Sequence, residues 1–255
     1  KYPGGKWRIA DWIIKHFPPS YKVYLEPFFG SGAVFFTKPK SMLETVNDLD
    51  GNIVNLFRVC REHTKELIRG IELTPFSREE YITCSEETEE PIERARRTLV
   101  RYWQSFGTSN SSKRSWKNSQ AENSPNCPRQ WNQLPEILQN ICGRLKEAQI
   151  ENYDAMELIR RYNSPETLIY CDPPYNQEIR KKKIYKCELD DAGQIRLLQV
   201  LKESKAKIIL SGYDNELYNT ELKGWYTDEK ETTAQMGLKR REKLYMNFQP
   251  PLLYF

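Results

Sequence analysis

The sequence is poor in histidine, in paired cysteines and in long apolar runs. Two histidines in 255 residues, and six cysteines without a C-x-x-C pair, argue against a metal site and against a disulfide framework. We therefore expect no bound metal and reduced thiols. No stretch approaches the roughly 18 apolar residues of a membrane span, and no secretory signal peptide is visible. These absences predict a cytoplasmic protein with no membrane partner.

The charges nearly balance. Lys and Arg number 39 and Asp and Glu number 35, which gives a net charge of +4. This balance excludes little, and it leaves nucleic acid open as a partner if the basic residues cluster. Aromatic residues make up 12% of the chain, too many for a disordered protein. A chain of 255 residues can form one large domain or one domain that carries an insertion.

Alternating strand and helix patterns run through both ends of the chain. Strands are predicted at residues 23–26, 43–48, 168–172 and 207–211, and helices at 52–70 and 192–202. Apolar strands that alternate with helices indicate an α/β fold with a parallel sheet. The middle differs, because residues 107–128 are rich in Ser and Asn and lie between two helical patterns. We therefore predict a mostly helical insertion over residues 60–148.

Two motifs follow the first two predicted strands. In the segment EPFFGSG, residues 26–32, Gly30 and Gly32 would let the backbone approach a ligand closely, and the helix start behind them offers unpaired N–H groups. Its place between strand and helix supports a ligand-binding loop, with an ordinary tight turn as the alternative. After the next strand, Asp48 could accept hydrogen bonds from both hydroxyls of a ribose. The alternative for Asp48 is a helix N-cap, a role for which Asp50 is the better candidate.

A third motif, Asp172-Pro173-Pro174-Tyr175, ends another buried strand pattern. Two consecutive prolines fix the backbone and donate no hydrogen bonds, so the Asp172 side chain and the Pro173 carbonyl are both acceptors. Tyr175 adds a flat ring. Two acceptors beside a stacking surface suit a planar group with an amino substituent, such as a nucleobase. The alternative is a proline turn with a capping aspartate.

Together these motifs resemble those of the Dam-like DNA adenine methyltransferases, in the same order along the chain. The matching segments are residues 1–6 (KYPGGK), 26–32, 47–48, 152–154, 172–175, 211–213 and 241–248. The catalytic motif at residues 172–175 matches in full. The resemblance does not extend convincingly into residues 107–130, which correspond to the variable target-recognition region of the family.

The resemblance implies a Rossmann-like methyltransferase fold. It has a mostly parallel seven-stranded sheet with one antiparallel strand, flanked by helices. Residues 1–59 and 149–255 would form a discontinuous catalytic domain that binds S-adenosylmethionine. Residues 60–148 would form an inserted, mostly helical target-recognition domain that binds DNA.

The resemblance also implies which residues contact the cofactor. They are Tyr2, Lys6, Glu26, Pro27, Phe28, Gly30, Gly32, Asp48, Asp154 and Asp172. In this set Asp48 holds the ribose hydroxyls and Asp154 accepts from the adenine amine of S-adenosylmethionine. Lys6 and Glu26 lie near the methionine portion, where Lys6 pairs with the carboxylate unless it is only a solvated lysine.

The mechanism implied by the resemblance is direct methyl transfer. The target adenine is flipped from the double helix into a pocket formed by the catalytic residues Asp172, Pro173, Pro174 and Tyr175. Its amino group donates to Asp172 and to the Pro173 carbonyl and then attacks the sulfonium methyl group. Tyr175 stacks on the flipped base. Neither a metal nor a covalent enzyme intermediate is required.

Basic and aromatic residues in the insertion and after the catalytic motif are the expected DNA contacts. Residues 101–130 hold five basic side chains and one acidic side chain. The predicted DNA-binding residues are Lys113, Arg114, Trp116, Lys117, Arg129, Arg180, Lys181 and Lys182. A solvated surface is the alternative for both basic runs. Arg94, Arg96 and Arg97, which alternate with glutamates, favour an exposed helix with ion pairs.

Two rival functions are open at this point. Related catalytic motifs methylate cytosine amino groups, glutamine side chains or RNA adenines, but Asp172 with the flanking motifs favours DNA adenine. A catalytically dead nucleic-acid-binding protein would keep the fold, yet every catalytic position is intact. We therefore predict a site-specific adenine methyltransferase of bacterial or phage origin that acts on double-stranded DNA. Whether a companion restriction endonuclease is a further partner stays open.

Overall fold

The computed structural model describes residues 5–105, 116–118, 126–174, 189–233 and 239–251. The chain divides into two compact units. The sheet unit is formed by Lys6–Leu49 and Glu151–Phe255, and the helical unit contains Asp50–Ile150.

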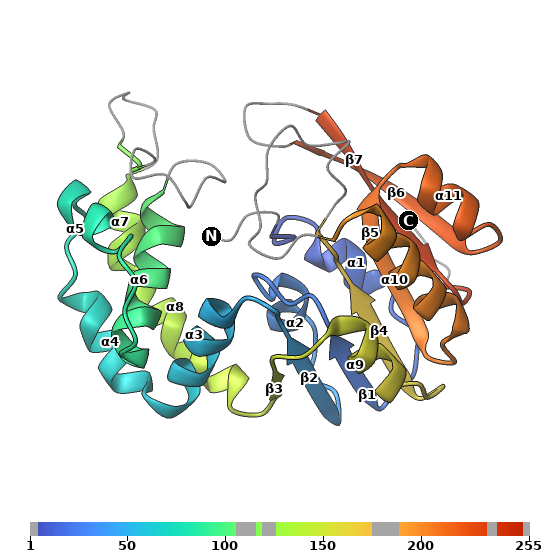
Figure 1. Ribbon diagram of the computed structural model, residues 1–255, viewed down its shortest axis with the longest axis horizontal. Coiled ribbons are helices and arrows are strands. Elements are labelled where there is room, and N and C mark those ends of the chain that lie inside the picture. Colours follow the sequence, from blue (N-terminus) through green and yellow to red (C-terminus); the bar gives the residue numbers. More distant parts are fainter. Residues whose placement is uncertain (1–4, 106–115, 119–125, 175–188, 234–238, 252–255) are drawn as a thin grey trace. The chain divides into compact units, whose positions relative to one another are not determined.

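Seven strands form one sheet (Figure 1). They are β1 (Val23–Glu26), β2 (Leu43–Asn47), β3 (Gln149–Glu151), β4 (Thr167–Cys171), β5 (Lys207–Tyr213), β6 (Tyr226–Thr233) and β7 (Lys239–Met246), in the order β3-β2-β1-β4-β5-β7-β6. β1 pairs in parallel with β2 and β4, and β4 pairs in parallel with β5. β7 is antiparallel to both of its neighbours. The predicted mostly parallel, seven-stranded sheet is confirmed.

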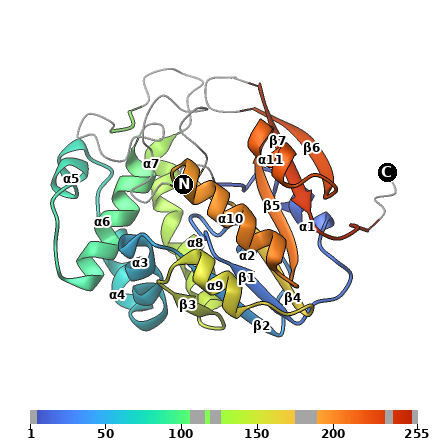
Figure 2. The same cartoon turned by 45° about the vertical axis from the view of Figure 1, so that its right-hand side comes forward.

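Helices cover both faces of the central strands. α2 (Ala33–Thr37) links β1 to β2, and α10 (Asp191–Glu203) links β4 to β5. These two links run outward from the centre in opposite directions, so right-handed crossovers place the two helices on opposite faces. α9 (Ala155–Arg161) and α11 (Glu216–Glu221) pack into the same apolar cluster as α10, and α1 (Ala10–Lys15) packs beside α2 (Figure 2).

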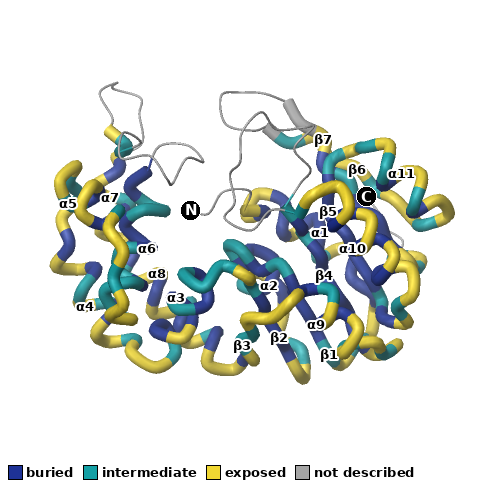
Figure 3. The backbone as a smooth tube through the Cα atoms, in the orientation of Figure 1, coloured by how far each residue is buried: buried dark blue, intermediate teal, exposed yellow. Residues whose placement is uncertain are grey.

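The central strands are buried on both faces (Figure 3). Ile169 of β4 and Ile208 of β5 pack with Leu158 of α9 and Leu197 of α10 in that cluster. Strands of a helix-covered parallel sheet carry continuous apolar runs, because neither face meets water. This is why the central strands were predictable from apolar runs alone.

The parallel pairing decides where the sequence motifs meet. β1 lies between β2 and β4, with Leu25 opposite Thr45 on one side and opposite Ile169 on the other. The carboxyl ends of these three strands therefore lie at one edge of the sheet, where ligand sites of α/β proteins form. The EPFFGSG segment, Asp48 and Asp172 directly follow these ends.

The helical unit contains α3 (Gly51–Glu62), α4 (Thr64–Glu72), α5 (Arg78–Thr83), α6 (Pro91–Gln104), α7 (Cys127–Asn132) and α8 (Leu134–Leu145). α3 packs against α6 and α8, so the helical unit includes the chain from Asp50 onward, together with Lys1–Gly5, whereas the predicted insertion began at residue 60. The side chain of Arg94 in α6 also donates to the Asn52 Oδ1 atom in α3, at 2.8 Å. Among the described helices, none combines the length and the apolar character needed to cross a membrane.

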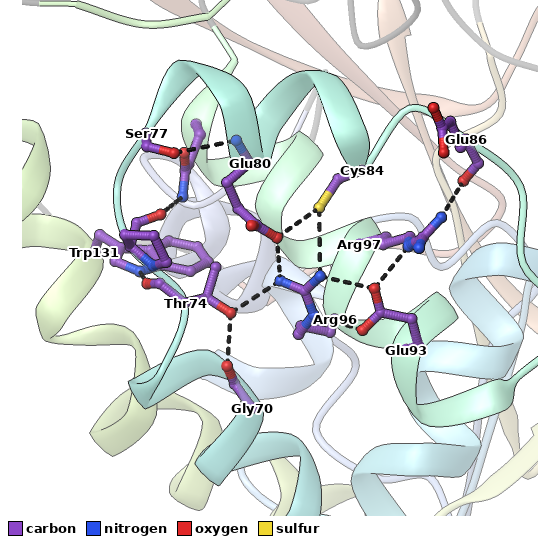
Figure 4. A network of polar contacts seen from close by, with 12 residues as sticks. Gly70, Thr74, Ser77, Glu80, Cys84, Glu86, Glu93, Arg96, Arg97 and Trp131 are labelled. Atoms are coloured by element: carbon purple, nitrogen blue, oxygen red, sulfur yellow. Dashed lines mark hydrogen bonds and ion pairs between the residues drawn. The ribbon is translucent and has the colours of Figure 1, made fainter.

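Arg96 of α6 is the centre of a polar network inside the helical unit (Figure 4). Its guanidinium donates to Glu93 at 2.6 and 2.7 Å, to Glu80 at 2.5 Å and to Thr74 at 2.9 Å. The Thr74 carbonyl accepts from Trp131 Nε1 at 2.7 Å. The predicted ion pairs are confirmed for Arg96 and Arg97, but the Arg96 side chain is only 16% exposed. One guanidinium with five donors here joins several helices instead of facing solvent.

Candidate active site

The segment after β1 turns sharply at two glycines. Gly30 and Gly32 have φ angles of 49° and 62°, in the left-handed region that favours glycine. A Cβ atom at Gly32 would lie 2.4 Å from Phe29 Cζ and 2.7 Å from Phe36 Cε2. Gly32 is therefore required by the turn and by aromatic packing, and α2 begins directly behind it. The backbone N–H of Gly30 donates to Asp48 Oδ2 at 2.8 Å, which ties the turn to the end of β2.

Asn47, the last residue of β2, joins three segments of the site. Its Nδ2 donates to the Pro27 carbonyl at 2.9 Å and to the Tyr153 carbonyl at 3.0 Å, and its Oδ1 accepts from Tyr153 N at 2.8 Å. Asn152 Nδ2 adds a bond to the Asp48 carbonyl at 2.7 Å. Asn47 is buried, so its amide is fully used for positioning. Asn47 belongs to the matching segment 47–48 but is not among the predicted site residues, although a polar side chain at the end of a buried strand is a signal for one.

Asp48, Asp50 and Asp154 have different local roles. Asp50 caps α3, as expected, by accepting from Asn52 N at 3.0 Å. The carboxylate of Asp48 bonds the glycine turn instead. Asp154 is exposed and caps α9, with Met156 N and Glu157 N each donating to its Oδ1 atom at 3.0 Å. The ribose and adenine roles of Asp48 and Asp154 stay predictions.

Asp172 follows β4, and two side chains from distant parts of the chain hold its Oδ1 atom. Ser211 of β5 donates to it at 3.0 Å, and Lys6 Nζ forms an ion pair with it at 3.1 Å. Lys6 is also paired with Glu242 of β7 at 3.4 Å. Lys6 is buried, so the solvated alternative is wrong. Burial alone would lower the pKa of Lys6, but the negative charges of Asp172 and Glu242 outweigh it and raise the pKa above its ordinary value.

Glu26, at the end of β1, is a buried carboxyl group beside this ion pair. Tyr24 donates a hydrogen bond to its Oε2 atom at 2.7 Å. Burial raises the pKa of Glu26 to about 8, and the charge of Asp172 acts in the same direction, whereas the Tyr24 bond and Lys38 oppose the shift. Glu26 is therefore mostly protonated at neutral pH. Asp172 and Glu26 are thus two nearby carboxyl groups whose surroundings differ.

The two prolines after Asp172 are held from α10. Gln194 Nε2 donates to the Pro174 carbonyl at 2.8 Å, and Gln194 Oε1 accepts from the Tyr218 hydroxyl at 2.7 Å. Gln194, Tyr218 and Ser211 were not selected from the sequence as site residues. Gln194 and Tyr218 carry no local signal, because their partners lie 20 and 24 residues away. Ser211 lies in the matching segment 211–213, 39 residues from Asp172.

Several predicted site residues lie outside the described part of the chain. They are Tyr2, Lys113, Arg114, Tyr175, Arg180, Lys181 and Lys182. The others fall into both units: Lys6, Glu26, Pro27, Phe28, Gly30, Gly32, Asp48, Asp154, Asp172, Pro173 and Pro174 belong to the sheet unit, and Trp116, Lys117 and Arg129 belong to the helical unit. Over the described ranges, no group of three His, Cys, Asp or Glu side chains could hold a metal ion.

The predicted DNA contacts in the helical unit have distinct surroundings. The Trp116 ring lies 5.5 Å from the Phe76 ring, and the Arg78 guanidinium lies 4.9 Å from its centre. Trp116 Nε1 donates to Gln104 Oε1 at 3.4 Å. Arg129 is exposed on α7. Trp116 therefore has a structural role in this unit, and a DNA contact through Trp116 or Arg129 stays a prediction.

Comparison with known proteins adds to this geometry. Residues 2–240 match the family described as D12 class N6 adenine-specific DNA methyltransferase. The chain is 26% identical over 239 residues to a DNA adenine methylase of Haemophilus influenzae, and the alignment covers 86% of this chain and 82% of the relative. It is 25% identical over 279 residues to the type II methyltransferase M.MjaIII of Methanocaldococcus jannaschii, with 96% and 95% covered. The chain therefore belongs to the D12 class of N6 adenine-specific DNA methyltransferases and is an enzyme that methylates adenine in DNA.

Proposed function

We propose that this enzyme transfers a methyl group from S-adenosylmethionine to the 6-amino group of an adenine flipped out of double-stranded DNA. The position of Asp172 carries the proposal. It follows β4 at the edge where the β1 turn and Asp48 also lie, and Ser211 and Lys6 hold its carboxylate. Cys171, the neighbouring thiol, is fully buried, and burial raises its pKa. Such a thiol stays protonated and is unsuited to covalent catalysis, which favours direct transfer.

The ends of β1 and β2 fit the methyl donor. The turn at Gly30 exposes backbone close to Asp48, whose carboxylate we assign to the two ribose hydroxyls. Asp154 is assigned to the adenine amine, and its exposed position at the start of α9 leaves it accessible. Lys6 and Glu26 are assigned to the methionine portion. When bound, S-adenosylmethionine supplies a methyl group made electrophilic by its sulfonium sulfur.

Asp172 and the Pro173 carbonyl are assigned to the amino group of the target adenine. That nitrogen is a poor nucleophile because its lone pair is delocalised into the ring. Hydrogen bonds from its two N–H groups to these acceptors favour a pyramidal nitrogen with an available lone pair. Positive charge would develop on the nitrogen as the new N–C bond forms and the methyl–sulfur bond breaks, with S-adenosylhomocysteine as the leaving group. The Asp172 carboxylate would stabilise this charge until one N–H proton is released to solvent. Tyr175 is assigned to stack on the base.

We assign DNA recognition to the helical unit and to the basic run that follows the catalytic motif. Arg129 and Lys117, with Lys113, Arg114, Arg180, Lys181 and Lys182, would neutralise phosphates or read guanine edges. Trp116 would contribute through the aromatic and basic surface that it forms with Phe76 and Arg78. The name of the Methanocaldococcus jannaschii relative, a type II methyltransferase, supports a restriction–modification role for this enzyme. In such a role a companion endonuclease cuts the unmethylated site.

The test is to incubate the protein with methyl-labelled S-adenosylmethionine and unmethylated double-stranded DNA, digest the DNA, and identify the labelled nucleoside. Label in 6-methyladenine is the expected result, with single-stranded DNA, RNA and protein as parallel substrates. The Asp172→Asn variant, which keeps the side-chain shape, is the matched control and should give little label. Label confined to cytosine, RNA or protein would contradict the proposal.

A further inference from the structure

A buried glutamine, Gln194, connects the catalytic segment at Pro173-Pro174 to the helices α10 and α11. We propose that Gln194 and Tyr218 form a positioning relay that holds the Pro173-Pro174 backbone in the geometry needed for methyl transfer. Gln194 lies on α10 and Tyr218 on α11, and both belong to the sheet unit. This inference rests on the proposed function, because the relay acts through the assigned acceptors.

The side chains of the relay are buried and its hydrogen bonds have ordinary lengths. Gln194 is 1% exposed and Tyr218 is 4% exposed. Gln194 Nε2 donates to the Pro174 carbonyl at 2.8 Å, and the Tyr218 hydroxyl donates to Gln194 Oε1 at 2.7 Å. A buried amide must have partners for both its donor and its acceptor, or burial is costly. Gln194 satisfies both through one backbone atom of the catalytic segment and one tyrosine.

The chemistry of proline explains why this contact matters. Neither Pro173 nor Pro174 has a backbone N–H, so their carbonyl oxygens are the only backbone groups through which this segment can be held. On one side of the segment, Ser211 and Lys6 hold Asp172. On the other side, Gln194 holds the Pro174 carbonyl. The Pro173 carbonyl, assigned to the target amine, lies between these two anchored points of the chain.

Tyr218 completes the hydrogen bonding of the Gln194 amide. The Pro174 carbonyl can only accept, so it requires the Gln194 amino group, and the Tyr218 hydroxyl then donates to the remaining Oε1 atom. Without that hydroxyl, Oε1 would be a buried acceptor that has lost this donor, and the Gln194 side chain would be held less firmly against the segment. Burial raises the pKa of Tyr218, so its hydroxyl remains a donor over the working pH range. Tyr218 thus acts on the catalytic segment without touching it.

The decisive variant is Gln194→Glu, which keeps size and shape but replaces the donor by an acceptor when ionised. At about pH 9 we expect kcat to fall about tenfold or more, since small misplacements of reacting groups are costly. KM for DNA and the thermal shift produced by S-adenosylmethionine should stay near wild type. As the pH falls to about 6, the introduced carboxyl becomes protonated and can donate to the Pro174 carbonyl, so the ratio of variant to wild-type kcat should rise.

Tyr218→Phe tests the second half of the relay against a matched control. It removes only the hydroxyl and should lower kcat about two- to tenfold, the effect of one neutral hydrogen bond. Tyr245→Phe is the control, because the Tyr245 ring lies 5.7 Å from the Tyr218 ring but its hydroxyl donates to Asn219 instead. Tyr245→Phe should leave kcat unchanged.

Three outcomes would overturn the relay. One is a Gln194→Glu kcat within about twofold of wild type at every pH. Another is a Gln194→Glu kcat that is reduced by the same factor at every pH, with a reduction no larger than the lost thermal stability explains. If Gln194→Glu does not fold, Gln194→Leu removes the donor without adding charge, and a near-normal kcat in that variant is the third. A wild-type enzyme that labels no DNA would instead contradict the proposed function.

Discussion

The sheet unit and the helical unit use buried polar side chains for different purposes. In the sheet unit, Asn47, Ser211 and Gln194 direct their hydrogen bonds at backbone or carboxylate groups that follow the ends of strands. In the helical unit, Arg96 directs its bonds at other side chains, Glu80 of α5 and Glu93 of its own helix α6. The first arrangement orients a site, and the second holds a scaffold together. Loss of the first should therefore reduce activity, and loss of the second should reduce stability.

The two units also differ in the direction in which they shift the pKa of a glutamate. In the sheet unit, burial raises the pKa of Glu26 to about 8. In the helical unit, hydrogen bonds from Arg96 and Arg97 lower the pKa of Glu93 below its ordinary value. In a site that binds a charged ligand, the ionised form of a buried carboxyl group can be unfavourable as long as the ligand is absent. A scaffold carboxylate is instead paired within the fold.

The largest effect should come from Asp172→Asn. The variant loses the charge that stabilises the developing positive nitrogen, so we expect the single-turnover methylation rate to fall about 10²- to 10³-fold. The variant should stay folded, although its melting temperature should fall because the buried Lys6 loses its ion pair with Asp172. The control is Asp191→Asn, an exposed aspartate of the same unit, which should methylate normally. A normal rate for Asp172→Asn would refute the assigned chemistry.

Arg96→Leu should break the scaffold but not the chemistry. Removing the guanidinium leaves Glu93 and Glu80 without their shared partner, and we expect the free energy of unfolding to fall by about 2–4 kcal/mol. Urea unfolding measures this loss. Methylation per folded molecule should stay near wild type.

The control for Arg96→Leu is Arg61→Leu, which breaks an exposed pair with Glu62 and should cost less than about 1 kcal/mol. Equal stability of the two variants would show that the network in Figure 4 contributes no more than a surface pair. If Arg96→Leu lost DNA affinity but kept its stability, Arg96 would be a DNA-recognition residue and not a residue that stabilises the fold.

The two glutamates should respond to pH with opposite sign. The folded-state pKa of Glu26 lies above its ordinary value of 4.5, so its charge opposes folding increasingly as the pH rises from about 4.5 to about 8. Glu26→Gln should therefore gain stability relative to wild type over that range. The folded-state pKa of Glu93 is lowered, so its stabilising effect is present above its ordinary value and is lost as the pH falls through the folded-state pKa.

Melting temperatures of Glu26→Gln and Glu93→Gln measured from about pH 8 to below pH 4.5 capture both effects, because the Glu93 effect is lost below the ordinary pKa of 4.5. Glu93→Gln should be less stable than wild type at neutral pH, and the difference should shrink in acid. If both variants change with pH in the same direction, the contrast between the two units is wrong.

The smallest effect should come from Arg129→Ala. Arg129 is exposed, and we expect DNA affinity to fall about two- to fivefold and the slope of log affinity against log salt to decrease by about one. Fluorescence anisotropy with labelled duplex DNA at several salt concentrations measures both. Lys223→Ala removes an exposed charge from the sheet unit and should change neither quantity. An unchanged salt slope for Arg129→Ala would place α7 outside the DNA contact.

The strands and motifs of the sheet unit were largely predictable, but the boundary of the helical unit was not. Buried parallel strands carry continuous apolar runs, and turns at Gly30 and Gly32 have a local steric cause. The helix of residues 51–62 has an ordinary amphipathic pattern, and only packing against α6 and α8 assigns it to the helical unit. The same holds for Arg96, whose glutamate partners were expected but whose burial depends on the neighbouring helices.

By itself, the sequence determined the features with local causes: the strand runs, the cap at Asp50, the glycine turn and the rigid proline pair after Asp172. Only the tertiary structure decided the partners across the chain. Lys6 meets Glu242, 236 residues later, and Asn47 at the end of β2 meets Tyr153 because β3, which Tyr153 follows, is the neighbour of β2 in the sheet. Gln194 reaches Pro174 because a right-handed crossover returns α10 along the sheet. Hydrogen bonds between distant segments follow from the order of strands, which spacing along the chain does not encode.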